Sequence, residues 1–165
     1  MTQKHPVTLR SIYLKPGELL VTSEPCEVTT VLGSCISVTL FHSRLRYAGI
    51  CHGMLPGPIP NANALPHNAE RYKYLSEAIT FMAGKFRMMG MAMHEIEVKM
   101  FGGGNVIGQS VQQNSDRWIG TVNIQAAQAL LETESLAIKT GCVGGNMGRK
   151  ILFNTYTGDV LHRYL

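Results

Sequence analysis

Short stretches rich in apolar and β-branched residues recur along the chain, and turn-forming residues separate them. Runs of this kind predict β-strands. They lie at 6–13, 18–22, 28–32, 35–41, 46–52, 95–101, 136–140, 149–154 and 159–165. The segment 42–45 lies between two of these runs, so we expect 35–41 and 46–52 to pair as an antiparallel hairpin.

Two longer segments show the spacing of three and four residues that is typical of amphipathic helices. In the first, 68–90, Asn68 is the expected N-cap, and the apolar stripe comprises Tyr72, Leu75, Ile79, Met82, Phe86 and Met89. In the second, 116–134, the expected apolar face comprises Ile119, Val122, Ala126, Ala129 and Leu130. A Pro- and Asn-rich stretch at 54–68 predicts a surface loop.

Strands outnumber helices in this pattern, and the helices come as inserts between strands. There is no internal repeat and no interdomain linker, so we expect one domain over residues 1–165. The order of elements predicts an α/β (α+β) fold, a layered sandwich with a largely antiparallel sheet and two main helices.

Composition agrees with a globular chain. The 165 residues are 45% hydrophobic and 16% charged, which suits one domain with a real core. The net charge of +4 comes from scattered Lys and Arg residues, so we expect no nucleic-acid partner. The N-terminus lacks the apolar region of a signal peptide, and no apolar run approaches membrane-spanning length. We therefore expect a cytoplasmic protein without direct membrane insertion.

Four cysteines bear on the chemistry: Cys26, Cys35, Cys51 and Cys142. None forms a CxxC motif, and disulfides are not expected in a reducing compartment. A zinc site formed by the first three cysteines with His52 is an alternative, but it lacks the close ligand pairs of structural zinc sites. We expect no metal and no cofactor.

Cys35 follows a bend at Gly33 and Ser34, where the chain resumes as a strand. A catalytic thiol requires a base within hydrogen-bond reach. If the hairpin turn is centred between residues 43 and 44, Cys35 lies directly opposite His52, and both side chains share one face. The alternative is a buried cysteine beside a partly exposed histidine.

Other histidines fit this geometry less well. His42 points to the opposite face because it lies an odd number of residues from Cys35. His67 lies in the Pro/Asn-rich loop, where nothing fixes it. Thr29 and Thr30 are the nearest upstream groups that could orient an imidazole, provided that the bend folds their strand back toward the site. Backbone N–H groups near Ser34 and Cys35 would then form an oxyanion hole.

Several longer motifs point to a family. They are "TTVLGSCISV" (29–38), "AGICHGMLP" (48–56), "VKMFGGGNV" (98–106), "IGTVNIQAAQALL" (119–131) and "GGNMGRKILFNTYTGDVLHRYL" (144–165). With these motifs the chain resembles the CheD family of chemoreceptor glutamine deamidases over nearly its whole length. The resemblance implies a fold similar to the catalytic domain of cytotoxic necrotizing factor.

The resemblance also implies a Cys–His–Thr triad. Cys35 corresponds to the nucleophile and His52 to the base, and the family's threonine, six residues before the cysteine, falls on Thr29. Thr30 is adjacent and remains the alternative. Gly33 and Ser34 would shape the oxyanion hole.

The implied activity is deamidation of receptor glutamines to glutamate through a cysteine thioester, with hydrolysis of glutamyl methyl esters by the same route. The implied partners are the chemoreceptor cytoplasmic domain and a CheC-type phosphatase, with Phe101, Gly102, Gly103 and Gly104 as candidate contacts. A non-catalytic adaptor that binds such a phosphatase or a receptor is the alternative. A nucleotide binder is disfavoured, because the glycine-rich stretches contain neither GxGxxG nor GxxxxGK[ST].

Overall fold

A computed structural model describes residues 8–58, 68–106 and 118–165. Over these ranges the chain forms β1 (Arg10–Tyr13), β2 (Leu19–Thr22), β3 (Cys26–Leu32), β4 (Ile36–His42), β5 (Tyr47–Cys51), the 3₁₀ helix η1 (Asn68–Lys73), α1 (Leu75–Met88), the 3₁₀ helix η2 (Met93–Glu95), β6 (Glu97–Gly102), α2 (Ile119–Thr133), β7 (Ile138–Val143), β8 (Arg149–Asn154) and β9 (Val160–Tyr164). None of these helices is long and apolar enough to span a bilayer.

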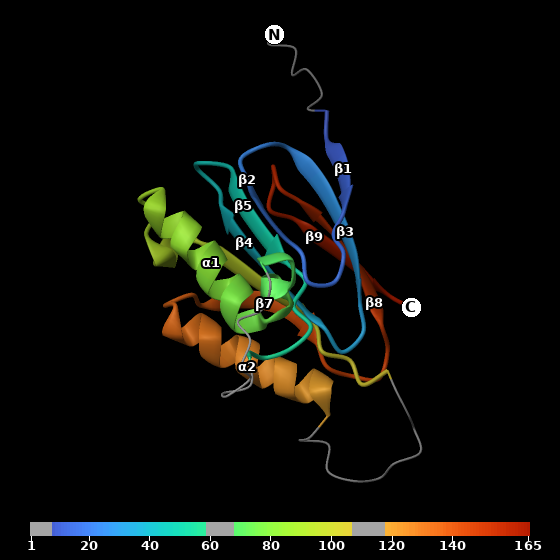
Figure 1. Cartoon of the computed structure of the whole chain (residues 1–165). Helices are drawn as coiled ribbons and strands as arrows, with labels where there is room; N and C mark the ends of the chain where they lie inside the picture. The colour runs from blue at the N-terminus through green and yellow to red at the C-terminus, as the bar shows by residue number, and fades with distance from the viewer. Residues whose placement is uncertain (1–7, 59–67, 107–117) are drawn as a thin grey trace.

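The strands form two sheets. One has the order β1-β3-β8-β9, and the other has the order β2-β5-β4-β6-β7. The sheets pack face to face, and α1 and α2 cover the outer side of the five-stranded sheet (Figure 1). Only the β1–β3 and β6–β7 pairs are parallel among the described pairings. The predicted layered α+β class and its largely antiparallel pairing are confirmed, although the strands divide between two sheets.

The five-stranded sheet is the middle layer, which explains the continuous apolar run in β4. All seven residues of β4 are buried, because one face packs on the helices and the other on the four-stranded sheet. Ile36, Val38 and Leu40 belong to the core beneath α1 and α2. Phe41 belongs to the second core, between the sheets, together with Val28.

The helices begin and face differently from the prediction. The segment 68–73 forms η1, and α1 starts at Leu75 after Tyr74, so the expected N-cap at Asn68 is wrong. α2 buries Gly120, Asn123, Ala127 and Leu131, whereas Ile119 is 42% exposed. Close backbone packing decides which face of α2 is buried. A Cβ at residue 120 would lie only 2.5 Å from the carbonyl oxygen of Gly103, so this position accepts only glycine.

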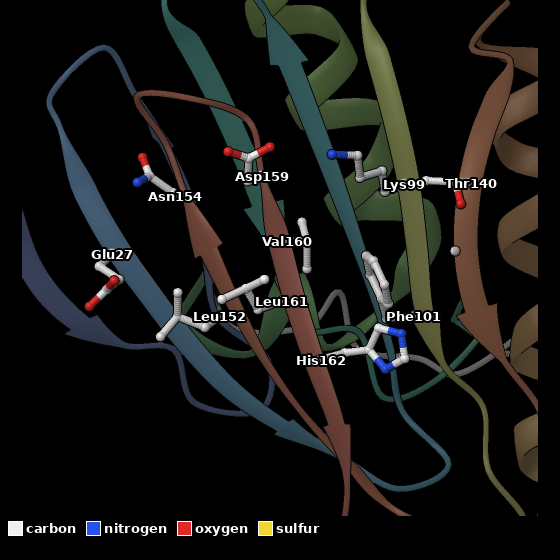
Figure 2. A pocket seen from close by; sticks show the side chains of 11 residues that line it. Glu27, Lys99, Phe101, Thr140, Leu152, Asn154, Asp159, Val160, Leu161 and His162 are labelled. Carbon is white, nitrogen blue, oxygen red and sulfur yellow. The ribbon is translucent and has the colours of Figure 1, made fainter.

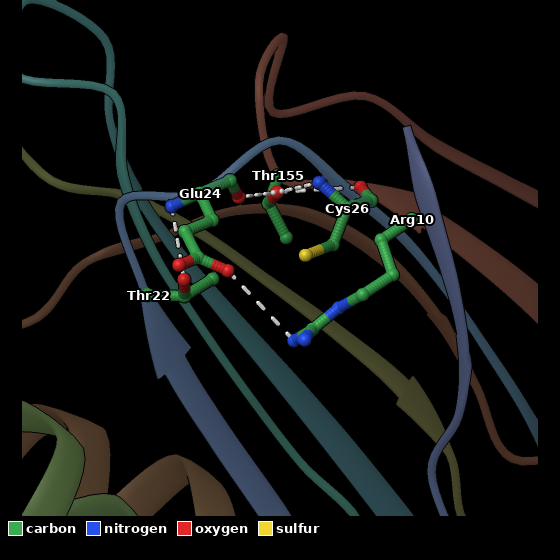
Figure 3. Close-up of polar contacts among 5 residues, drawn as sticks. All are labelled: Arg10, Thr22, Glu24, Cys26 and Thr155. Carbon is green, nitrogen blue, oxygen red and sulfur yellow. Dashed lines mark hydrogen bonds and ion pairs between the residues drawn. The ribbon is translucent and has the colours of Figure 1, made fainter. Parts of the chain in front are cut away.

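A polar cluster fixes the start of β3 (Figure 3). The Thr155 hydroxyl donates to the Glu24 carbonyl at 2.8 Å and accepts from the Cys26 N–H at 2.7 Å. Arg10 pairs with Glu24 at 3.9 Å on the outside. This cluster lies at the first residue of β3, so the opposite end of the strand leads into the bend before Cys35.

Candidate active site

Cys35 lies on the connection that carries the chain from β3 in one sheet to β4 in the other. The bend at Gly33 and Ser34 makes this crossing. Gly104 N–H donates to the Gly33 carbonyl at 2.8 Å, and Gly103 N–H donates to the Cys35 carbonyl at 2.9 Å. The Cys35 side chain is partly buried against the core between the sheets.

The glycines after β6 serve this connection by close packing. Phe101 is only 3% exposed, and Gly102, Gly103 and Gly104 are all buried. Gly102 has φ +108°, and a Cβ there would lie 2.0 Å from the Cys35 carbonyl oxygen. These four residues are covered by the chain itself, so their burial counts against a partner-contact rim here, and that role stays a prediction.

His52 follows β5 and is 1% exposed. The strands pair Thr39 with Ile50, and a bridge pairs Ile36 with Gly53. His52 is therefore a diagonal neighbour of Cys35, and the predicted directly opposed pair is wrong by two residues. Because an even shift preserves the faces of a strand, both side chains still point toward the four-stranded sheet.

Thr30 holds the imidazole from the opposite sheet. Its hydroxyl lies 2.7 Å from His52 Nδ1 and 2.7 Å from the Leu14 carbonyl oxygen. The carbonyl can only accept, so the single hydroxyl hydrogen goes to Leu14 and the Thr30 oxygen accepts from Nδ1–H. The proton of the neutral ring is thus on Nδ1, and the lone pair is on Nε2.

Thr29 does not take this position. It lies on the other face of β3, where it pairs with Leu152, and its carbonyl accepts from Leu14 N–H. The resemblance placed the third triad member at Thr29, but in the structure the adjacent alternative, Thr30, contacts His52 instead.

Burial controls the charge of both reactive groups. Burial lowers the pKa of His52 to about 4, although the Leu14 backbone and the Glu18 carboxylate raise it to a smaller extent. Burial also raises the pKa of the Cys35 thiol, while its own backbone N–H lowers it to a smaller extent. His52 Nε2 has no hydrogen-bond partner among the described residues. At neutral pH both groups are therefore uncharged. The two side chains share a face, but no hydrogen bond joins the Cys35 thiol to His52 Nε2 in this structure.

Most other candidate groups lie elsewhere. His42 is on the helix side of its strand and contacts Glu95, with 3.3 Å between Nε2 and Oε2. Cys51 also faces the helices, and burial raises its pKa to about 11. The described residues contain no cluster of three or more potential metal ligands. His67 and much of the predicted loop lie outside the described residues.

Asn123 was missed by sequence reasoning. It is 0% exposed on α2, and its Nδ2 donates to the carbonyls of Ser34 and Met54, both at 3.0 Å. Its signal in the sequence is a polar residue within "IGTVNIQAA", one position away from the apolar face that was expected.

The hollow shown in Figure 2 is separate from this site. It has a volume of about 500 Å³ and is lined by residues of β9 and β6, including His162 and Phe101, whose ring centroids are 5.9 Å apart. None of Cys35, His52 and Thr30 lines it.

Comparisons with known proteins show which family this chain resembles. The family model described as CheD chemotactic sensory transduction matches residues 54–164. The "Probable chemoreceptor glutamine deamidase CheD 2" of Geobacter sulfurreducens is 38% identical over 100% of this chain and 96% of its own length. The "Probable chemoreceptor glutamine deamidase CheD" of Oleidesulfovibrio alaskensis is 40% identical over 92% of this chain and 71% of its own length.

A solved structure, the hypothetical protein YfiH of Bacillus licheniformis, covers 75% of this chain and 49% of its own at 12% identity, with a TM-score of 0.46. That likeness is too weak to support any inference, and the similarity to cytotoxic necrotizing factor stays a prediction. The family model and the full-length relatives give a consistent assignment: the chain belongs to the CheD family.

Proposed function

We propose that this protein deamidates glutamine side chains of chemoreceptors to glutamate, as the names of its relatives state of those proteins. The observation that carries the proposal is the hydrogen bond between Thr30 and His52. It leaves the Nε2 lone pair free on the face that also carries Cys35. A thiol and an oriented base are the two groups that acyl transfer from a carboxamide requires.

The reaction proceeds in two halves. Nε2 of His52 takes the thiol proton while the sulfur of Cys35 attacks the carboxamide carbon. The resulting tetrahedral intermediate collapses, the imidazolium gives its proton to the leaving nitrogen, and ammonia departs from a thioester. Water then attacks the thioester with His52 again as base, which releases glutamate and regenerates the thiol.

Backbone N–H groups supply the oxyanion hole. The carbonyls of Gly33, Ser34 and Cys35 are all engaged as acceptors, by Gly104, Asn123 and Gly103. The N–H groups of Ser34 and Cys35 donate none of the backbone bonds recorded between described residues. These two donors are therefore available for an oxyanion at the attacked carbon.

Cys35 and His52 are both uncharged in the resting enzyme. This favours general-base catalysis, in which His52 removes the thiol proton during attack, over a thiolate–imidazolium pair that exists before substrate binds. Thr30 contributes a neutral oxygen, which stabilises an imidazolium less than a carboxylate does, so we expect a modest turnover.

A glutamyl methyl ester would pass through the same thioester and lose methanol instead of ammonia. A CheC-type phosphatase is the further partner in this proposal.

We assign the reaction to the cytoplasm. All four cysteines are free, and two of them are fully buried. This suits a reducing compartment.

The test is mass spectrometry of a purified receptor cytoplasmic fragment after incubation with the protein. Wild type should produce the one-dalton gain of deamidation at specific glutamines, and Cys35→Ala should abolish it. Cys142→Ser is the matched control, because Cys142 is the other partly exposed thiol, and it should retain activity. Binding of the fragment without any mass change would overturn the proposal in favour of a non-catalytic adaptor.

A further inference from the structure

Asn123 makes contacts that the Cys–His–Thr triad does not account for. Its Nδ2 uses both hydrogens, one on the Ser34 carbonyl and one on the Met54 carbonyl, each at 3.0 Å. These two carbonyl acceptors fix the orientation of the Asn123 amide. If the amide were flipped, Oδ1 would face two carbonyl oxygens and could accept from neither. Oδ1 is buried and has no partner among the described residues.

The position of this amide is unusual for a helix interior. A buried polar group is costly unless it is hydrogen-bonded, and the neighbouring buried positions of α2 are Gly120, Ala127 and Leu131. The Asn123 amide instead connects Ser34, the residue before Cys35, with Met54, two residues after His52. It therefore ties together the two segments that carry the reactive groups.

The bond to Ser34 also determines the direction of the next N–H. The Ser34 carbonyl and the Cys35 N–H belong to one planar trans peptide unit, so they point in opposite directions. Asn123 draws the carbonyl toward α2, on the helix side of the five-stranded sheet. The Cys35 thiol packs on the other side, in the core between the sheets.

The N–H of Cys35 is accordingly directed toward the side of its own sulfur. The effect of this N–H on the thiol agrees, since it lowers the Cys35 pKa against the larger opposing effect of burial. An N–H on that side lies next to the carbon that the sulfur attacks, where the oxyanion develops.

We propose that Asn123 is a positioning residue that orients the peptide between Ser34 and Cys35, so that the Cys35 N–H stabilises the oxyanion of the tetrahedral intermediate. This inference rests on the proposed function. It assigns Asn123 no contact with the substrate and no proton transfer.

The experiment separates oxyanion stabilisation from thiol activation. Asn123→Ala and Asn123→Ser both shorten the side chain and cannot bridge the two carbonyls. Loss of one oxyanion-hole donor costs about a hundred- to a thousandfold in kcat. For a donor that is misdirected rather than removed, we expect kcat for deamidation to fall by about ten- to a hundredfold, with little change in KM.

Alkylation by iodoacetamide should be unaffected. The thiol displaces iodide at a saturated carbon, where no oxyanion forms, so the rate of Cys35 modification should match that of wild type in both variants. Equal losses in deamidation and alkylation would overturn the proposal, because they would mean that the thiol and the base had moved apart. An unchanged kcat in both variants would overturn it as well.

Leu131→Ala is the matched control on the same helix. Leu131 is fully buried in the core beneath the helices, a core that contains none of Cys35, Thr30 and His52. Its truncation should destabilise the fold by about 2–5 kcal/mol yet leave kcat unchanged where the protein is folded, as judged by circular dichroism. A kcat loss in Leu131→Ala as large as in Asn123→Ala would reduce Asn123 to a structural residue.

Failure of the proposed function is distinguishable. If wild type does not deamidate receptors but hydrolyses p-nitrophenyl acetate through Cys35, the receptor assignment fails. The inference is then tested on that ester, whose hydrolysis also passes through a tetrahedral oxyanion. A wild type inactive on both substrates would overturn both.

Discussion

His52, directly after β5, and Thr30 in β3 are joined by a 2.7 Å hydrogen bond that crosses the interior of the sandwich. The two adjoining strands belong to different sheets, so the packing of the sheets sets the orientation of the ring. The Leu14 carbonyl takes the hydroxyl hydrogen of Thr30 and thereby decides which ring nitrogen is protonated.

Replacing Thr30 should impair turnover more than replacing Thr29. Thr30→Val leaves Nδ1–H without its acceptor, and a buried unsatisfied group costs about 1–3 kcal/mol. We expect kcat to fall by about ten- to a hundredfold, since each tenfold corresponds to about 1.4 kcal/mol. Thr30→Ser should retain most of the activity. Initial deamidation rates on one receptor fragment make the comparison, and a larger loss in Thr29→Val would contradict the assignment.

His52→Gln should lose more activity than any other histidine variant. Glutamine keeps much of the volume but cannot exchange a proton with Cys35 or with the leaving nitrogen. Acid–base catalysis contributes about a hundred- to ten-thousandfold. His42→Gln disturbs a partly buried contact with Glu95, so it should lower the melting temperature and leave kcat intact. Comparable kcat losses in the two variants would contradict the assignment of His52 as the catalytic base.

The acid limb of the pH–rate profile should lie near the lowered pKa of His52. The base works only when it is unprotonated, and burial lowers its pKa to about 4. We therefore expect kcat/KM to stay nearly constant as the pH falls from 7 to 5 and to decline only below that. A decline centred near 6.5, the usual value for histidine, would show that the ring is solvated in the working enzyme.

The same pKa makes stability depend on pH. The unfolded chain protonates His52 near pH 6.5, whereas the folded protein does so near 4. Between these values the unfolded state binds more protons, so the free energy of unfolding falls as the pH falls. At about 1.4 kcal/mol per pKa unit, the loss is roughly 3 kcal/mol by pH 4.

Urea unfolding at pH 7, 5.5 and 4.5 measures this dependence. His52→Gln should flatten it, whereas Cys35→Ala keeps the histidine and should keep the slope. An identical slope in wild type and His52→Gln would assign the pH dependence to other groups.

The four thiols should differ in accessibility. Cys26 and Cys51 are fully buried, while Cys35 and Cys142 are partly exposed. Iodoacetamide at neutral pH should label the latter two in the folded protein and all four in urea, as resolved by peptide mass mapping. Because burial raises the Cys35 pKa, its labelling should accelerate as the pH rises. Labelling of Cys51 in native conditions would indicate local opening.

Sequence reasoning recovered the face shared by Cys35 and His52 because strand faces depend only on odd or even spacing. It missed the register because the turn occupies residues 43–46 and Arg46 adopts φ 50°. An arginine carries no signal for that left-handed conformation, whereas glycine or asparagine would have done so. The resulting shift is even, so the pairing was wrong while the shared face was right.

Thr29 and Thr30 could not be separated from the sequence, because the bend between them and Cys35 interrupts the alternation of faces. Asn123 was missed for a different reason. Apolar periodicity selects the most hydrophobic face of a helix, but α2 buries the face where Gly120 approaches the backbone of Gly103. Such a close approach is a property of two segments together, and neither segment reveals it alone.

The distribution of the site over three layers has a consequence for biosynthesis. Thr30 comes from the outer sheet, His52 from the middle sheet and Asn123 from the helical layer. Both α2 and β8, the strand that pairs with β3, follow Cys35, Thr30 and His52 along the chain. A nascent chain that has not yet released these elements contains the thiol, the threonine and the imidazole, but it lacks both the Asn123 amide and the strand that pairs with β3. We therefore expect the site to be assembled only after most of the chain has been translated.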